Sequence, residues 1–194
     1  MKGLGALVGL FALLALSSDS KQQGHGQGAP PGGASGSGRE VTRLRTGDAT
    51  ESAWRQIRLP ILVGTLSELG DLAGRVALSI LAQWAHETNR GTHEFNYNLG
   101  GWHARRGEDY FTARDVQEGP ALVHWSAYTD LPVAIRDQVR RLKAGFPSAW
   151  SLLVGSPESS AWVERLGKLG YYSSSPAAYA TAWAMHRAEL GAMS

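Results

Sequence analysis

Cysteine is absent from the 194-residue sequence, which excludes disulfide bonds and thiolate metal sites. Net charge is low as well, because 19 basic and 17 acidic residues leave a formal charge of +2. No basic run is interleaved with aromatic residues, so the composition gives no support to nucleic-acid binding. A mildly cationic chain of this kind suits an anionic polymer such as a bacterial cell wall.

Three segments of different composition divide the chain. Lys2 precedes an apolar run over residues 4–16, which has the length of a signal-peptide core and is short for a spanning helix. We therefore expect residues 1–17 to be a signal peptide or an N-terminal anchor of a secreted or cell-envelope protein. Residues 18–42 are rich in Ser, Gln, Gly and Pro and are predicted to form a flexible linker. Residues 43–194 contain all 7 Trp and should form one folded domain.

The clearest helical pattern lies between residues 73 and 88. Its bulky apolar residues Val76, Ile80 and Trp84 recur every four positions, which places them on one face of a helix. The same face continues to Glu87, although an ionised carboxylate is rarely buried without a partner. This placement makes Glu87 the first candidate for a functional residue.

Two interpretations of Glu87 follow from its position. Partial burial and the negative end of the helix dipole would both raise its pKa, the direction that a general acid needs. Gly91 is suited to end the helix just beyond it. Alternatively, Glu87 turns outward and pairs with Arg90 or a neighbouring histidine. Periodicity by itself leaves both interpretations open.

The rest of the domain is predicted to be mostly helical with one hairpin. Pro60 should end or interrupt a first helix around Trp54, and residues 65–68 fit a capping box for the next helix. Asp130 should cap a later helix. The remaining expectations are a loop at 96–102, strands at 109–117 and 121–128, apolar faces at Ile135/Val139/Leu142, Trp162/Leu166/Leu169 and Tyr179/Trp183/Leu190, and helix starts at Ser156-Pro157 and Ser175-Pro176.

Several short motifs in this order resemble a known family. They are Ala82-Gln83-Trp84-Ala85-His86-Glu87-Thr88, then Asn96-Tyr97-Asn98-Leu99-Gly100-Gly101, the hairpin, and Gly170-Tyr171-Tyr172 before Pro176 and Tyr179. Together they resemble the glucosaminidases of glycoside hydrolase family 73, of the flagellar and autolysin types. The resemblance implies a lysozyme-like α+β domain with a small β-hairpin lobe. It also implies an endo-β-N-acetylglucosaminidase that cuts peptidoglycan glycan strands, without a cofactor and as a monomer.

The sequence departs from that family at three places. The Phe of the family's Leu-Phe-Gly loop is Gly100 here, and the Gly-Trp-Gly that usually follows the glutamate reads Asn89-Arg90-Gly91. The family's Tyr-Ala-Thr-Asp-Pro segment is replaced by residues 172–176. These changes bear on contacts with substrate more than on the chemistry, because the glutamate, an asparagine and a tyrosine remain.

The resemblance assigns catalytic roles to two carboxylates. Glu87 matches the general acid that protonates the glycosidic oxygen, and Asp115, four residues before a glycine of the hairpin, matches the second carboxylate. A solvated charge near the hairpin tip is the alternative interpretation of Asp115, and Glu118 and Asp109 are the other hairpin candidates. If none is close enough, the N-acetyl group of the substrate can act as the nucleophile.

Aromatic and amide side chains complete the expected site. Tyr172 matches the active-site tyrosine of the family, with Tyr171 as the fallback. Tyr97 and Asn98 resemble residues that line the sugar cleft, although Asn98 can also simply stabilise its own turn. Trp102 and Trp125 are able to stack on sugar faces, but packing is the more common role of large aromatic residues.

The histidines of this region do not have the spacing of a metal site. A zinc protease motif needs a second histidine four residues after His86, where the chain has Arg90. His93 is about 10 Å from His86 if the segment is helical, too far to share one ion. No metal is therefore expected. A muramidase or lytic transglycosylase on the same fold remains an alternative, as does a non-catalytic glycan-binding or virion structural protein.

Overall fold

The computed structural model describes residues 36–44, 51–114 and 122–192. The expected signal segment, most of the expected linker, and the hairpin candidates Asp115 and Glu118 lie outside these residues. Residues 36–44 run beside the hairpin, where the Arg39 N–H donates to the Tyr110 carbonyl at 2.6 Å. None of the helices in the described part is long and apolar enough to cross a membrane.

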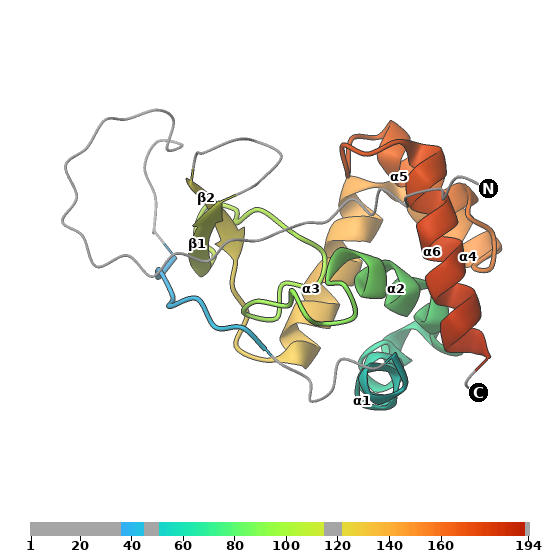
Figure 1. Ribbon diagram of the computed structural model, residues 1–194, viewed down its shortest axis with the longest axis horizontal. Coiled ribbons are helices and arrows are strands. Elements are labelled where there is room, and N and C mark those ends of the chain that lie inside the picture. Colours follow the sequence, from blue (N-terminus) through green and yellow to red (C-terminus); the bar gives the residue numbers. More distant parts are fainter. Residues whose placement is uncertain (1–35, 45–50, 115–121, 193–194) are drawn as a thin grey trace, which may run out of the picture.

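Most of the described chain is helical. The helices are α1 (Glu51–Thr65), the short 3-10 helix η1 (Ser67–Leu69), α2 (Leu72–Glu87), α3 (Leu131–Gly145), α4 (Pro147–Gly155), α5 (Ala161–Lys168) and α6 (Pro176–Gly191). In Figure 1 they gather on one side of the molecule, and a two-stranded hairpin stands on the other. The architecture is therefore α+β and mostly helical, with a small hairpin lobe, as the sequence predicts.

Helix α2 lies at the centre of the helical body, in contact with α1, α4 and α6. The face predicted from the sequence is the buried one, because Val76, Ile80 and Trp84 are all 1% exposed or less. Burial on this scale supplies most of a helix's stability, at about 25 cal/mol per Å² of apolar surface. The packing of α2 in the core thus fixes the position of its last residue, Glu87.

The later helices follow their predicted boundaries in part. Asp130 caps α3 as expected, since its carboxylate accepts the Val133 N–H at 2.9 Å. The predicted faces of α3 and α6 are buried. Helix α5 begins at Ala161 and not directly after Ser156-Pro157, because residues 156–160 form turns, and Leu169 lies just beyond its end and is exposed. Helix α4 was not predicted separately.

Two expectations about the first helix are wrong. Pro60 does not end α1, which continues to Thr65 with the proline inside it. The expected capping box at residues 65–68 is also wrong, because the Thr65 hydroxyl donates back to the Ile61 carbonyl at 2.7 Å. A threonine that bonds the preceding turn belongs to the end of a helix and not to the start of the next.

The hairpin consists of β1 (Tyr110–Arg114) and β2 (Leu122–Ser126), paired antiparallel with Phe111 opposite Trp125. Its turn, residues 115–121, lies outside the described residues. One face carries a second, smaller core made of Phe95, Phe111, Ala113, Trp125 and Ala127. Because a two-stranded hairpin is marginal by itself, this cluster is what holds the lobe in place.

Candidate active site

Glu87 is the last residue of α2, and the chain turns sharply after it. The Thr88 hydroxyl donates to the Trp84 carbonyl at 2.7 Å and accepts the Gly91 N–H at 2.9 Å. Asn89 and Arg90 both adopt left-handed conformations, with φ of 45° and 53°. This turn stops the helix at Glu87, so its side chain lies at the edge of the core and is only partly exposed.

The carboxylate of Glu87 accepts a hydrogen bond from the hydroxyl of Tyr179. Arg90, one of the partners that the alternative interpretation offered besides a neighbouring histidine, pairs with Glu189 at 3.0 Å. The pKa of Glu87 is raised to about 7, because burial disfavours its charged form more than the Tyr179 hydrogen bond favours it. At neutral pH a large fraction of Glu87 is therefore protonated and able to donate a proton.

Two stacked tyrosines support this carboxyl group. The rings of Tyr172 and Tyr179 lie 3.8 Å apart at their centroids and are nearly parallel. The Tyr172 hydroxyl, however, donates to the Val163 carbonyl at 2.7 Å. Tyr179 is thus the tyrosine that reaches Glu87. The sequence predicts it on the apolar face of the last helix and at the end of the motif order after Pro176, and assigns it no role in the site. Its place three residues after Pro176, next to the motif tyrosines, is the signal that could have identified it.

Histidine side chains lie beside the tyrosine that donates to Glu87. The His86 ring meets the Tyr179 ring edge-on at 4.5 Å. The pKa of His86 is lowered to about 4, first by burial and then by the nearby His186. His86 is therefore neutral at pH 7 and adds no positive charge that would stabilise ionised Glu87. Among the described residues, no group of three or more His, Asp and Glu is arranged to hold a metal ion.

The loop at 96–102 is ordered by its own asparagine. The Asn98 amide accepts the Trp102 N–H at 2.9 Å and donates to the Trp102 carbonyl at 2.8 Å. Asn96 and Tyr97 adopt left-handed conformations, with φ of 48° and 56°. Asn98 therefore closes its turn, and it also lines a pocket beside Glu87.

The other expected aromatic contacts pack beneath this loop. The Tyr171 hydroxyl donates to the Gly100 carbonyl at 2.9 Å, and the Trp102 ring meets the Tyr171 ring edge-on at 5.1 Å. A Cβ atom at Gly100 would lie 2.6 Å from Trp102 Nε1 and 3.0 Å from the Tyr171 hydroxyl. This crowding leaves no room for a side chain at Gly100. Trp125 is buried in the hairpin core.

The pocket beside Glu87 lies between the end of α2 and the hairpin lobe. It encloses about 40 Å³, and we call it the Glu87 pocket. Glu87 is its one carboxylate among the described residues, which leave out the hairpin turn with Asp115. Asp109 is directed elsewhere, because it pairs with Arg39. The residues lining the Glu87 pocket are Glu87, His93, Phe95, Asn98, Gly101, Phe111 and Trp125.

Glu94, which follows His93 of the Glu87 pocket, has a structural partner. Its fully buried carboxylate accepts hydrogen bonds from Arg58 at 2.6 and 2.7 Å. The pKa of Glu94 is nevertheless raised, because desolvation outweighs the attraction of Arg58. A buried pair of this kind joins α1 to the loop after α2, and loss of one partner leaves the other charge uncompensated.

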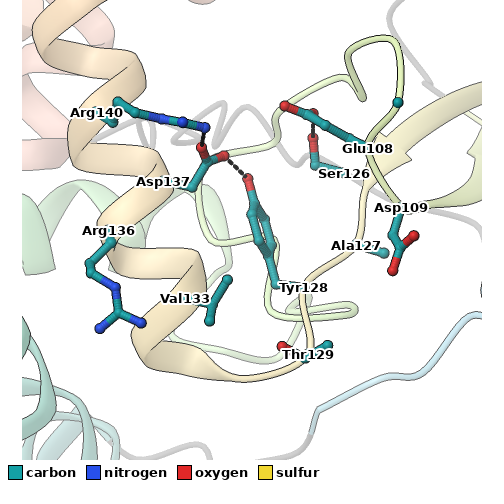
Figure 2. A pocket seen from close by; sticks show the side chains of 11 residues that line it. Glu108, Asp109, Ser126, Ala127, Tyr128, Thr129, Val133, Arg136, Asp137 and Arg140 are labelled. Carbon is teal, nitrogen blue, oxygen red and sulfur yellow. Dashed lines mark hydrogen bonds and ion pairs between the residues drawn. The ribbon is translucent and has the colours of Figure 1, made fainter. Parts of the chain in front are cut away.

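A larger pocket of about 530 Å³ lies between the base of the hairpin and α3 (Figure 2). We call it the hairpin–α3 pocket. It is lined by residues 107–109, residues 126–129 and four side chains of α3, and it shares no lining residue with the Glu87 pocket. The carboxyl group with the raised pKa near 7 lies in the smaller Glu87 pocket, which is therefore the candidate active site.

Comparison with known proteins identifies the fold as that of a peptidoglycan hydrolase. The structure matches the peptidoglycan hydrolase from Sphingomonas sp. A1 with a TM-score of 0.57 and 22% identity over 74% of this chain and 95% of that one. A glutamate-to-alanine mutant of the same hydrolase matches with a TM-score of 0.57 and 21% identity, over 74% and 97% of the two chains. No family model and no curated protein sequence matches the chain. The shared lysozyme-like α+β fold confirms the predicted fold class.

Proposed function

We propose that this protein is a peptidoglycan hydrolase, an endo-β-N-acetylglucosaminidase in which Glu87 is the general acid. The observation that carries the proposal is the Glu87 carboxyl group, with a pKa of about 7, at the edge of a pocket between helical body and hairpin lobe. The fold shared with a peptidoglycan hydrolase supports the substrate class. We expect the protein to act as a monomer in the cell envelope or outside the cell, with no cofactor.

The chemistry begins with proton donation. Protonated Glu87 donates its proton to the glycosidic oxygen as the bond to the sugar breaks, and the sugar develops oxocarbenium character. Tyr179 holds one carboxylate oxygen of Glu87 through its hydroxyl, which leaves the other oxygen for the substrate. Asn98 lines the same pocket and would bind a polar group of the sugar through the hydrogen-bonding capacity that its own turn leaves unused. Tyr179 is thus a positioning residue for the acid.

A second group must meet the positive charge on the sugar from the other side. We propose Asp115 for this role, as a base for water, with the substrate's N-acetyl group as the alternative nucleophile. A carboxylate separation of about 6.5–9.5 Å would leave room for that water and give inversion.

One observation favours a second candidate, a lytic transglycosylase. Glu87 is the one carboxylate among the described residues lining its pocket, and a transglycosylase can work with a single glutamate. The products separate the two reactions, since each leaves a different sugar at the new chain end. N-acetylglucosamine at the reducing ends of fragments from purified peptidoglycan would support the glucosaminidase. Anhydro-muramic ends would contradict it, and muramic-acid reducing ends would indicate a muramidase.

Zymography tests whether the protein is an enzyme at all. Wild-type protein should clear a gel containing purified cell walls, and Glu87→Gln should not, although both should bind walls in a pull-down. Glu158→Gln is the matched control, because Glu158 is exposed and far along the chain in the turn before α5. If wild type binds walls but clears nothing, the non-catalytic glycan-binding alternative replaces this proposal.

A further inference from the structure

The hairpin–α3 pocket is built from charged groups that largely neutralise one another. Glu108 pairs with Arg141, and Asp137 pairs with both Arg140 and Arg141. The Tyr128 hydroxyl donates to Asp137 at 2.8 Å from the opposite wall. Figure 2 shows the part of this network that joins Arg140, Asp137 and Tyr128. Such a connected network makes this part of the pocket rigid, because each charged group is hydrogen-bonded to another.

Arg136 is the positively charged lining residue that takes no part in this network. Three carboxylates line the pocket, Asp109 included, and each of them is paired with an arginine. Arg136 lines the pocket too, is exposed, and has no ion-pair or hydrogen-bond partner in the described part of the chain. In Figure 2 its side chain extends from α3 apart from the Asp137–Arg140 pair.

The network also keeps the pocket charges fixed near neutral pH. Burial raises the pKa of Asp137, but hydrogen bonds from Arg141, Tyr128 and Arg140 lower it more, so the net pKa is below its ordinary value. Asp137 therefore stays ionised and remains bound to its arginines. The charge available to a ligand is the guanidinium of Arg136, which can hold a carboxylate through two parallel hydrogen bonds.

The hairpin separates this pocket from the Glu87 pocket. Trp125 lines the Glu87 pocket and its neighbour Ser126 lines the hairpin–α3 pocket, and successive residues of a strand point to opposite faces. Layers on the two faces of a sheet are each about 10 Å from it, so the path around the hairpin is of that order, and four to five extended residues span roughly 13–17 Å. A short peptide attached to a sugar at one face can therefore reach the other.

We propose that the hairpin–α3 pocket binds the peptide stem of peptidoglycan, with Arg136 holding a carboxylate of that stem. The inference rests on the proposed function, which places the glycan strand at Glu87. A volume of about 530 Å³ is in the range of sites that hold a short peptide or small ligand. Tyr128, Val133 and Ala127 supply apolar surface beside the charged groups. The protein would then prefer strands that still carry their peptides.

Calorimetry with a soluble stem tetrapeptide tests the pocket without any catalysis. We expect wild type to bind the peptide, and Arg136→Gln to weaken binding about tenfold, the effect of one charge-assisted hydrogen-bonded contact. Lys143→Gln removes another exposed cation of α3 that does not line the pocket, and it should bind as wild type does. Arg136→Lys should weaken binding less than Arg136→Gln.

The same experiment contains the results that would overturn the proposal. The proposal is wrong if wild type and Arg136→Gln bind the tetrapeptide with equal affinity. It is also wrong if wild type binds the free tetrapeptide and one with amidated carboxyl groups with equal affinity. Displacement of the peptide by inorganic phosphate at equal concentration would indicate a phosphate site instead. Thermal unfolding checks that Arg136→Gln is folded, which we expect because Arg136 has no partner in the described part to lose.

Kinetics on two substrates separate this inference from the proposed function. On intact peptidoglycan, Arg136→Gln should raise KM about tenfold and leave kcat unchanged, whereas on glycan strands stripped of their peptides it should match wild type. Equal KM values on intact peptidoglycan would refute the pocket's role and leave the hydrolase proposal standing. If wild type cleaves neither substrate, the proposed function fails and the calorimetry still decides what the pocket binds.

Discussion

Replacement of Glu87 by glutamine changes two measurable properties in ways that the structure specifies. Glutamine has the size of a protonated glutamate and can still accept the Tyr179 hydrogen bond, but it has no proton to donate. We therefore expect Glu87→Gln to lower kcat by about 100- to 10,000-fold, the usual contribution of a general acid. Wild-type activity should fall as the pH rises through about 7, where Glu87 loses its proton.

The second property is the pH dependence of stability. The folded protein holds a proton on Glu87 up to a pKa of about 7, whereas the unfolded chain releases it at the ordinary value of 4.5. Wild type should therefore lose stability as the pH rises from about 4.5 to 7, by at most about 3 kcal/mol. Glu87→Gln has no such proton to lose, so it should equal wild type at pH 4 and exceed it at pH 8.

Urea unfolding at pH 4 and pH 8 measures this difference, together with a pH profile of wall lysis. The control is Glu158→Gln, an exposed carboxylate whose removal should leave both the lysis profile and the pH dependence of stability unchanged. A stability difference between Glu87→Gln and wild type that is the same at both pH values would refute the raised pKa. Full lytic activity of Glu87→Gln would refute its role as the acid.

Three further substitutions have expected outcomes. Tyr179→Phe removes the hydrogen bond that lowers the pKa of Glu87, so the alkaline limb of the lysis profile should move to higher pH; an unmoved limb would contradict the contact. Gly100→Ala should destabilise the protein by about 1–3 kcal/mol in urea unfolding, because its Cβ has no room. Arg58→Leu should cost about 3–5 kcal/mol at pH 7 and less at pH 4, where Glu94 is closer to neutral.

Matched controls separate these effects from general damage. Gly145→Ala, at the end of α3, introduces a Cβ with no atom within 4 Å and should be nearly neutral for stability. Equal destabilisation by Gly100→Ala and Gly145→Ala would show that the contacts around the loop do not decide the cost. Arg75→Leu removes an exposed arginine of α2 and should change stability by less than Arg58→Leu at pH 7.

Local sequence patterns predicted the features of the fold that depend on residues a few positions apart, such as helix faces and helix caps. The period of Val76, Ile80 and Trp84 identified the buried face of α2, because a helix face is set by spacing alone. The capping carboxylate of Asp130 was predicted for the same reason, since it bonds the backbone three residues away. The prediction that Pro60 ends or interrupts the first helix is wrong, because the packing of α1 against α2 and α3 outweighs the local cost of a proline.

The sequence by itself determined that a glutamate would end the central helix in line with its buried face, and it left open whether the side chain turns outward. It could not determine which group would meet that carboxylate, because Tyr179 lies 92 residues away along the chain. Packing of α6 against α2 brings the hydroxyl of Tyr179 to Glu87, while the hydroxyl of Tyr172 is taken by a backbone carbonyl. Burial, which no local pattern specifies, then raises the pKa of Glu87 to about 7. The sequence thus identified Glu87 as the candidate residue, and the tertiary structure determined the proton affinity of its carboxyl group.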